Sequence, residues 1–552
     1  MKRKLLSLVL AFCMTLSLVP AASAHWVTNE EGTKPADAKF KVEYFKPGEE
    51  TVVATRYFNN KGNDDWGGSE QATGDHLWDP ITVMGDHEEL KGCTKAVVTL
   101  FADITLEDTT ILVDKQHDVT ITSEGDTAHT IKCTLDGTIE AGEGGAHKPG
   151  MDAISIASDN EGNALTLDKV KVAISGPTAA AAAGEGTTNA TQGIYNDGTL
   201  TLQNGAEVTV NGVSQNGVNG SGTLAVQGAG TKLSVASVGG SGVKGGNVTV
   251  SEGASVSVTE AAYHGITATK DGGVTITGNS SVSVSGSAAN KGVALQSAGK
   301  LTITNSTLTL TDTQEEAPAG TETQTSGYDV AVASAGAAIS GATVTGDLRV
   351  GSGDATVDGS TVTGDITNAG AGVVSVTGET TVTGNVSNTS TGSVAVTGAK
   401  VTGTVSNTAT GALTVVGAEV GKIESAEGAS SVVVNSKVNG QDAEDNLSGL
   451  DSEKDKALIS ALNCKNEFPE LLGSDAGKEK LSWEKIVTSA HWLNTAKAVD
   501  NSSDSNKKAI YDAVLNEIEE YYASITALDM SGKKIAESGF DPIPNTGCLV
   551  MF

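Results

Sequence analysis

Three tyrosines are the residues of this sequence whose chemistry is easiest to interpret. The segment from residue 102 to residue 467 contains neither Phe nor Trp, and its only tyrosines are Tyr195, Tyr263 and Tyr328. A tyrosine ring can stack on the face of a sugar while its hydroxyl forms a hydrogen bond. We therefore take these tyrosines, with His264 beside Tyr263, as candidate ligand-binding residues for a glycan.

Two oxygen-rich turns are candidate metal ligands. The first contains Asn63, Asp64 and Asp65, and the second contains Asp159 and Glu161. Calcium prefers such oxygen ligands, but neither turn matches the pattern of an EF-hand loop. Solvated turns are the simpler interpretation, so we expect no cofactor, with calcium as the one candidate ion.

These residues must be positioned by a fold, and the fold has a strong sequence signal. A repeat of about 25 residues contains three short segments in which apolar residues alternate with Thr, Ser or other polar residues. Such alternation predicts three short strands per repeat. The second and third segments are, for example, "TLTL" from Thr199 and "EVTV" from Glu207. The first segments open with Gly followed by Val or Ile, at Gly193, Gly217, Gly242, Gly265 and Gly292.

A tighter repeat follows in the chain. Valines recur every 18 to 20 residues, at Val344, Val362, Val382, Val401, Val420 and Val438. Asparagines share another position of this repeat, at Asn368, Asn388 and Asn407. Aligned asparagines suit a corner, where stacked amides can form hydrogen bonds along the axis.

Stacking explains why such short strands are stable. A strand of three or four residues cannot bury a core alone, but in stacked coils each valine lies on the valine of the next coil, about 4.8 Å away. Slim β-branched residues then face inward, turn residues occupy the corners and Thr faces outward. The sequence therefore predicts an all-β solenoid.

The start of the repeat region carries a family resemblance. The segment "KAVVTLFADITLEDTTILVDKQHDVTI", from Lys95, resembles the first coils of right-handed parallel β-helices with the pectin-lyase-like fold, common in exported surface proteins of Gram-positive bacteria. The sequence departs from that pattern at "TSEGDTAHTI", from Thr122, where those proteins usually read "DLNGHTI". The resemblance implies a right-handed three-sheet parallel β-helix and an adhesin-like role at the cell surface.

The candidate tyrosines share one corner of the predicted coil. The repeat puts Tyr195 just after the Gly that opens a coil, Tyr263 just before one, and Tyr328 near the same junction. Two long insertions, residues 176–192 and 311–327, leave from this corner. Loops and aromatic residues along one edge of a rigid scaffold are typical of a binding site. The alternative is a corner that merely tolerates insertions and an occasional tyrosine.

The first 24 residues form a predicted secretory signal peptide. "MKRK" is basic, an apolar run follows, and Ala24 precedes a predicted cleavage site at His25. No other apolar run approaches the roughly 20 residues of a membrane helix. We expect a secreted protein, extracellular or associated with the cell surface, without a transmembrane segment after removal of the signal.

The charge balance excludes one class of partner. The chain has 67 Asp and Glu against 36 Lys and Arg, and its formal net charge is −31. Such a surface repels nucleic acid at long range. We therefore expect no nucleic-acid partner, and expect a polysaccharide or a glycan of the host or cell surface.

The cysteines do not form a disulfide scaffold, because four of them after signal cleavage are too few for this length. Cys93 and Cys133 are a candidate pair, which the sequence leaves open.

These patterns divide the chain into six segments. They are a signal peptide (1–24), an aromatic and acidic capping region (25–94), the parallel β-helix (95–440), a linker (441–452), a C-terminal α-helical cap or small bundle (453–530) and a flexible tail (531–552). The tail contains "IPNTG" at residues 543–547, which is similar to the sortase signal "LPXTG". Whether it acts as an anchor stays open.

Three functions remain at this point. The first is a non-catalytic surface or adhesin-like protein that contacts glycans. The second is a soluble protein that binds acidic sugars with the help of calcium. The third is a divergent polysaccharide lyase. Polygalacturonases of this fold carry the strings "NTD", "DD", "GHG" and "RIK", and none occurs in residues 95–440. We therefore expect no enzyme.

Overall fold

The structure is a computed structural model of the 552-residue chain. The residues it describes are 34, 36, 38–58, 81, 90–107, 110–135, 152–157, 162–177, 191–286, 293–311, 330–408, 410–427, 429–448, 481–482 and 528–529. The chain divides into two compact units, Met1–Ser334 and Ala335–Phe552, which we describe in turn.

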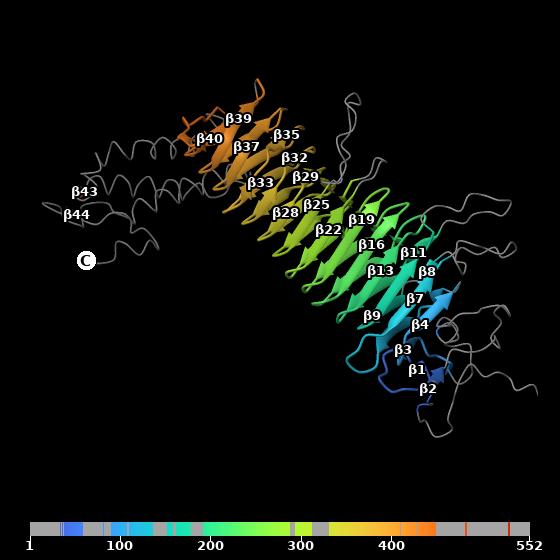
Figure 1. The fold of residues 1–552 in the computed structure, drawn as a ribbon. Helices are drawn as coiled ribbons and strands as arrows, with labels where there is room; N and C mark the ends of the chain where they lie inside the picture. Colours follow the sequence, from blue (N-terminus) through green and yellow to red (C-terminus); the bar gives the residue numbers. More distant parts are fainter. Residues whose placement is uncertain are drawn as a thin grey trace, which may run out of the picture. The chain divides into compact units, whose positions relative to one another are not determined.

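The first unit is a parallel β-helix whose full coils contribute one strand to each of three faces (Figure 1). The first face consists of β5 (Ile111–Val113), β8 (Asp152–Ile156), β11 (Gln192–Asn196), β14 (Val218–Asn219), β17 (Val243–Gly245), β20 (Ile266–Ala268), β23 (Leu295–Ser297) and β26 (Val330–Ala333). The second face consists of β3 (Lys95–Leu100), β6 (Asp118–Ser123), β9 (Ala164–Asp168), β12 (Thr199–Gln203), β15 (Thr223–Gln227), β18 (Asn247–Ser251), β21 (Val274–Thr277) and β24 (Leu301–Thr304). The third face consists of β4 (Ile104–Glu107), β7 (Thr130–Thr134), β10 (Lys171–Ser175), β13 (Glu207–Asn211), β16 (Lys232–Val238), β19 (Ser255–Ala261), β22 (Ser281–Ser285) and β25 (Thr307–Thr311).

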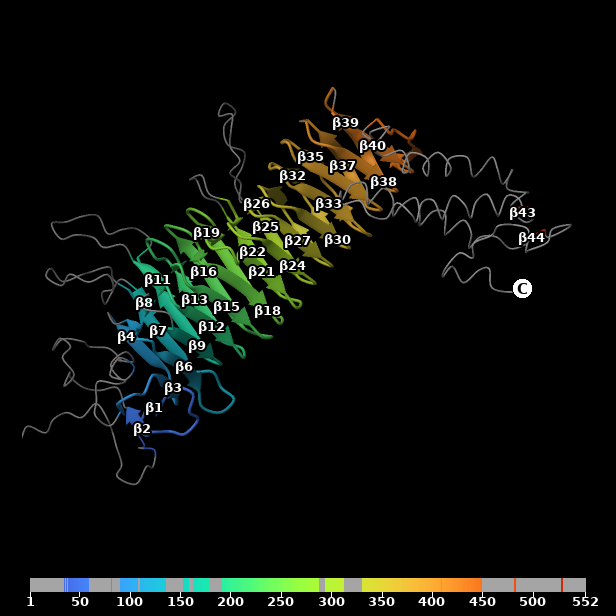
Figure 2. The ribbon, with the colours of Figure 1, turned by 180° about the vertical axis from the view of Figure 1, so that it is seen from behind.

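Within each face, a strand pairs in parallel with the strand three places earlier or later in the chain. For example, β12 lies between β9 and β15, as the view from behind shows (Figure 2). The register places Leu200 between Leu165 and Leu224, and all three are buried. Thr199, one residue earlier in β12, is exposed. Alternation along each short strand thus builds one apolar core through the coils.

The predicted parallel β-helix is confirmed, and its strand register agrees with the repeat in nearly every coil. Gly292 is the exception. Ile266 pairs with Leu295, so Ala294 occupies the position equivalent to Gly265. The assignment of Gly292 to that position was wrong, because the connection between β22 and β23 is longer than the corners of the three preceding coils and the position requires only a small side chain.

The repeated glycines are explained by close packing. A Cβ atom built on Gly242 would lie 2.3 Å from Val258 Cγ1 and 2.7 Å from the Gly265 carbonyl oxygen. Gly217 and Gly265 meet the same obstruction from Val235 and Val284. Each glycine therefore lets the third strand of its own coil pack against the start of that coil's first-face strand.

A β-hairpin pairs with one end of the second face of this unit. β1 (Phe40–Phe45) and β2 (Ala54–Phe58) pair with each other, and β1 also pairs with β3, all antiparallel. The rings of Phe40 and Phe58 stack with their centroids 4.9 Å apart. An added antiparallel hairpin covers the strand edge that a parallel coil would otherwise expose. The hairpin lies within the predicted capping region, residues 25–94.

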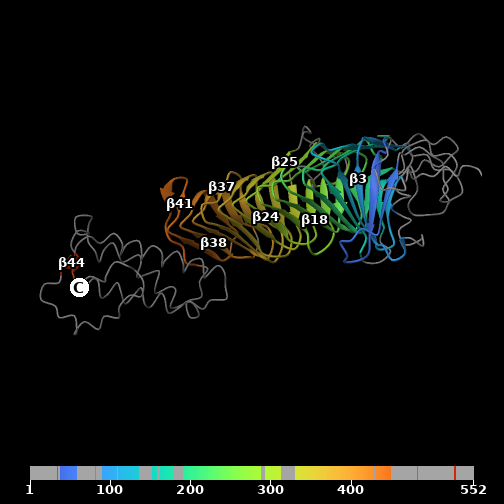
Figure 3. The same ribbon diagram turned by 90° about the horizontal axis from the view of Figure 1, so that it is seen from below.

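The second unit is also a parallel coil of three strand sets, with shorter turns. The first set consists of β27 (Ala337–Ser340), β30 (Ala355–Asp358), β33 (Val373–Thr377), β36 (Ser393–Thr397), β38 (Leu413–Val416) and β40 (Ser431–Val434). The second set consists of β28 (Thr343–Thr345), β31 (Thr361–Thr363), β34 (Thr381–Val382), β37 (Lys400–Asn407), β39 (Glu419–Ser425) and β41 (Lys437–Val438). The third set consists of β29 (Asp347–Val350), β32 (Ile366–Asn368) and β35 (Val386–Asn388), and β37 and β39 extend into it. Figure 3 shows β37, β38 and β41 from below.

The predicted valine column is present in this unit. Val344, Val362, Val382, Val401, Val420 and Val438 pair in register from strand to strand. The asparagine column is present too, since Asn368, Asn388 and Asn407 pair in register and are buried. Asn388 Nδ2 donates to Asn407 Oδ1 at 3.0 Å and to the Gly392 carbonyl at 2.8 Å. The bond from Asn388 to Asn407 is the contact between stacked amides that the repeat predicts, and the bond to Gly392 satisfies a corner carbonyl.

The second unit also ends in antiparallel pairing. β42 (Gln441–Asp442), within the predicted linker, pairs antiparallel with β41, and Asn446 forms a bridge with Val433. The predicted helical region, residues 453–530, lies outside the described residues except for β43 (Leu481–Ser482) and β44 (Leu528–Asp529), which pair in parallel. The predicted tail and signal peptide, with Ala24 and His25, also lie outside.

Candidate functional site

The corner between the third and first faces of the first unit carries Tyr263 and His264. It comprises residues 212–217, 239–242 and 262–265 in successive coils. These segments are stacked by backbone hydrogen bonds: the Gly240 N–H donates to the Gln215 carbonyl and the Tyr263 N–H donates to the Gly240 carbonyl, both at 3.0 Å. The corner is thus ordered, and we call its stacked segments, residues 212–217, 239–242 and 262–265, the ledge.

Tyr263 projects from this ledge. Its side chain is 47% exposed, and it is the most exposed large apolar or aromatic side chain among the described residues. Gly239 and Gly240 occupy the preceding coil, so no side chain rises from the ledge on that side. The ring meets His264 edge-on, with ring centroids 5.1 Å apart. The result is an accessible aromatic face on a rigid base.

His264 is half-buried and holds the next coil. Its Nδ1 accepts a hydrogen bond from the Val293 N–H at 3.1 Å. A nitrogen that accepts must be unprotonated, so the imidazole is neutral with its proton on Nε2. Burial lowers the pKa of His264 below its ordinary value, which favours this neutral form.

Tyr195 lies on β11 and is only half-buried. Its hydroxyl donates to Asp197 Oδ2, and Asp197 Oδ1 accepts from the Ser221 N–H at 2.7 Å and from Ser221 Oγ at 2.9 Å. Burial, with further contributions from Asp197, raises the pKa of Tyr195 to about 12. The hydroxyl is therefore already hydrogen-bonded within the protein, and this bond holds the ring in one orientation.

The register shows how the candidate residues are related. Tyr195 pairs with Asn219, and the same row continues through Lys244 to Thr267. Tyr263 precedes Thr267 by four residues and belongs to the same coil. Tyr195 and Tyr263 are thus three coils apart, about 14 Å along the axis at about 4.8 Å per coil. The structure places them on one side of the coil but in different columns; Tyr328 lies outside the described residues.

A polar group beside Tyr195 was not recognised in the sequence. Asp152 pairs in register with Gln192 and is 1% exposed. Gln192 Nε2 donates to Asp152 Oδ1 at 3.4 Å, and Asn219 Nδ2 donates to Gln192 Oε1. The three residues come from successive first-face strands. Asp152 and Gln192 share one position of the repeat, whereas Asn219 shares the position of Tyr195. A search for motifs along the chain overlooks such contacts between coils.

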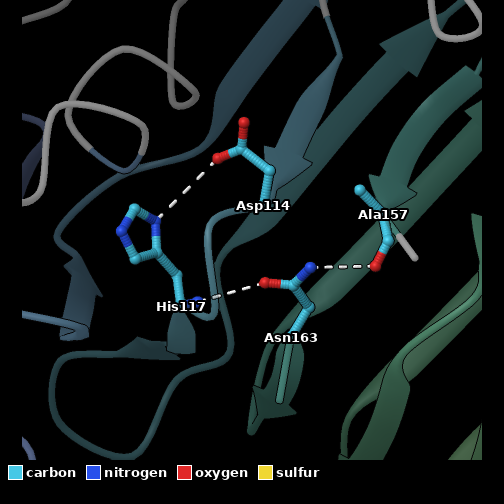
Figure 4. Close-up of polar contacts among 4 residues, drawn as sticks. All are labelled: Asp114, His117, Ala157 and Asn163. Atoms are coloured by element: carbon cyan, nitrogen blue, oxygen red, sulfur yellow. Dashed lines mark hydrogen bonds and ion pairs between the residues drawn. The ribbon is translucent and has the colours of Figure 1, made fainter. Parts of the chain in front are cut away.

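A second cluster links a turn to its neighbouring coil (Figure 4). His117 Nδ1 lies 4.0 Å from Asp114 Oδ1, and the His117 N–H donates to Asn163 Oδ1 at 3.1 Å. Asn163 Nδ2 in turn donates to the Ala157 carbonyl at 2.9 Å. His117 is only 2% exposed, so this arrangement stabilises the corner and offers no access to a ligand.

The second unit has a column of capping side chains at its own narrow corner. Asp347 Oδ1 accepts from the Asp365 N–H at 2.7 Å, and Asp365 Oδ1 accepts from the Asn385 N–H at 2.7 Å. Asn385 Oδ1 accepts from the Thr404 N–H at 2.8 Å. The signal for this column was the polar residue after Gly in each repeat. These carboxylates are used to hold neighbouring coils together.

The predicted metal ligands are not tested. Asn63, Asp64, Asp65, Asp159 and Glu161 all lie outside the described residues. Within the part of the chain that the structure describes, no group of three or more His, Cys, Asp or Glu side chains could hold a metal ion.

The cysteine pair that the sequence left open is not bridged. Cys93 and Cys133 are both free and buried. Cys133 faces the core on β7, where it pairs in register with Leu106 and Ile174. Burial raises the pKa of both thiols, that of Cys133 to about 12, so they act as small apolar residues of the core.

Comparison with known proteins adds no relative: no family model, no curated protein and no solved structure matches this chain. Over the residues that the structure describes, there is no helix with the length and apolarity of a membrane span.

Proposed function

We propose that this chain is a secreted, non-catalytic β-helix protein of the cell surface, resembling the exported proteins of the pectin-lyase-like fold, and that it binds glycans. The binding surface is the strip of the first unit that runs from Tyr195 through Asn219 and Lys244 to Tyr263. The observation that carries the proposal is the exposed ring of Tyr263 on a ledge held by backbone hydrogen bonds.

The chemistry of this strip suits a sugar chain. An exposed tyrosine face stacks on the apolar face of a pyranose ring, and neighbouring amide, ammonium and hydroxyl groups can bind the sugar hydroxyls. The scaffold is rigid, so little conformational entropy is lost when the ligand binds. The net charge of −31 favours a neutral glycan over a polyanionic one.

The test measures the affinity of the whole secreted chain for xylan, galactomannan and polygalacturonate. We expect Tyr263→Ala to weaken binding of the neutral polysaccharides roughly tenfold, which corresponds to about 1.4 kcal/mol of lost stacking. The matched control is Thr209→Ala, an exposed residue on the third face, which should bind as the wild type does. Binding that survives Tyr263→Ala unchanged would remove this strip as the site.

Two further measurements distinguish the proposed function from the other two functions that the sequence left open. Binding of polygalacturonate that a chelator abolishes would favour the calcium-assisted carbohydrate-binding protein. Release of unsaturated sugars that absorb in the ultraviolet would favour a lyase. Fractionation of the producing cells, to find the protein in the medium or on the wall, tests the surface location.

A further inference from the structure

The corner that carries Tyr263 is closed by side chains that hold the backbone of the next coil. In one coil, Asn216 Oδ1 accepts a hydrogen bond from the Ser241 N–H at 2.7 Å. In a later coil, His264 Nδ1 accepts from the Val293 N–H at 3.1 Å. The two residues occupy equivalent corner positions, directly before Gly217 and Gly265. They therefore perform the same task with different chemistry.

The difference is that only one of these side chains can change its charge near neutral pH. The amide oxygen of Asn216 accepts a hydrogen bond at any pH at which the protein is folded. His264 accepts only while its Nδ1 is unprotonated, and histidine is the side chain that ordinarily titrates between pH 5 and 8. Protonation of His264 would leave the Val293 N–H without its acceptor and would put a charge beside the Tyr263 ring.

We propose that His264 is a positioning residue for Tyr263, and that its bond to the Val293 N–H makes glycan affinity at this corner depend on pH. The affinity readout rests on the proposed function, whereas the closure of the corner does not. His264 thus holds the next coil closed and supports the exposed ring that contacts sugar.

The direction of the effect follows from the burial of the imidazole. Because burial lowers the pKa of His264 below its ordinary value of about 6.5, an opened corner takes up a proton more readily than the closed one. The closed corner is therefore fully stable above that ordinary value and loses stability as the pH falls below it.

Few other groups can produce this dependence. Around the corner, β17 carries Lys244 and β19 carries Glu260, whose Oε2 accepts from Ser237 Oγ at 2.7 Å. The strands β20, β22 and β23 carry no charged side chain. Lys291, two residues before Val293, lies outside the described residues. Glu260→Gln therefore serves as the control for the nearest carboxylate.

Hydrogen exchange of backbone amides tests the closure without any ligand. Between about pH 8 and about pH 5.5, after correction for intrinsic exchange, we expect the protection of the Val293 amide to fall roughly tenfold in the wild type. The Ser241 amide, held by Asn216, is the internal control and should keep its protection. His264→Asn, which copies Asn216, should keep Val293 protected at both pH values, and Glu260→Gln should follow the wild type.

Binding to xylan, galactomannan and polygalacturonate is then measured at the same two pH values. We expect affinity to fall roughly tenfold in acid for the wild type and less than twofold for His264→Asn. Equal pH dependence of Val293 and Ser241 in the wild type overturns the proposal, even if His264→Asn does not fold. A pH-dependent corner in a protein that binds none of the three polysaccharides would instead overturn the proposed function and leave the closure standing.

Discussion

The two units use the same strand arrangement with corners of different width. In the first unit, successive coils begin at Gly193, Gly217, Gly242 and Gly265, at steps of 24, 25 and 23 residues. In the second unit, the steps between Asn368, Asn388 and Asn407 are 20 and 19. Much of the extra length lies at one corner, where residues 212–217 connect β13 to β14 and residues 364–365 connect β31 to β32.

The width of this corner decides what the corner can do. Both units hold it together by the same device, a side-chain acceptor for a backbone N–H of the next coil. In the second unit, the capping residue Asp365 directly precedes β32, and the corner contains only Gly364 besides it. In the first unit, the longer corner has room for Tyr263 beside the capping residue His264. The glycan-binding surface that we propose therefore lies at the longer corner of the first unit.

The largest effect on stability is expected for Gly242→Ala in the first unit. Replacing glycine by alanine ordinarily stabilises a protein by about 0.4–1 kcal/mol through the unfolded chain. Here the new Cβ would lie 2.3 Å from Val258 Cγ1, so we expect a loss of about 3 kcal/mol in the free energy of unfolding, measured by urea denaturation.

Gly245→Ala is the matched control for that change. A Cβ on Gly245, in the same coil, finds its nearest neighbour at 3.4 Å, an ordinary contact. We expect this variant to be neutral or slightly more stable. Equal losses for both variants would show that glycine as such, rather than close packing at the corner, is what the repeat requires.

The next test is Asn388→Ala in the second unit. Asn388 is 0% exposed and its Nδ2 donates to Asn407 and to the Gly392 carbonyl. Removal leaves buried acceptors unpaired and a small cavity, so we expect a loss of about 2–3 kcal/mol by urea denaturation. Thr383→Ala, an exposed change in the same coil, should cost less than about 0.5 kcal/mol. A loss this small at Asn388 would mean that the valine column alone holds the narrow coil.

The smallest effect on stability is expected for a feature that both units share, a glutamate in register between two lysines. Glu207 lies in register between Lys171 and Lys232 in the first unit. Glu419 lies between Lys400 and Lys437 in the second. The distance from nitrogen to oxygen is 3.6 Å in the ion pair Lys171–Glu207 and 3.0 Å in Lys400–Glu419, and both pairs join partly exposed side chains.

Glu207→Gln and Glu419→Gln should each cost less than about 1 kcal/mol, and the cost should vanish at high salt. Thermal unfolding at low and high salt measures both. A larger cost in one unit that persists at high salt would show that the charged column contributes to one coil in a way that the other lacks.

The sequence by itself determined the coil, the strand periods and most of the register. Short strands with period-two alternation can bury their apolar side chains only by stacking, so identical positions such as Val362, Val382 and Val401 must lie on one another. The same logic placed the asparagine column at a corner. It misplaced Gly292, because an irregular connection hides the position that Ala294 fills.

Only the tertiary structure decided what the candidate side chains do. Hydrogen bonds between coils join residues about 20 or more positions apart, and a linear motif carries no sign of them. The bond of His264 to Val293, the bond of Asp197 to Ser221 and the cluster around Asp152 all arise in this way. Exposure likewise depends on the neighbouring coil: Tyr263 is accessible because glycines, not side chains, precede it on the ledge.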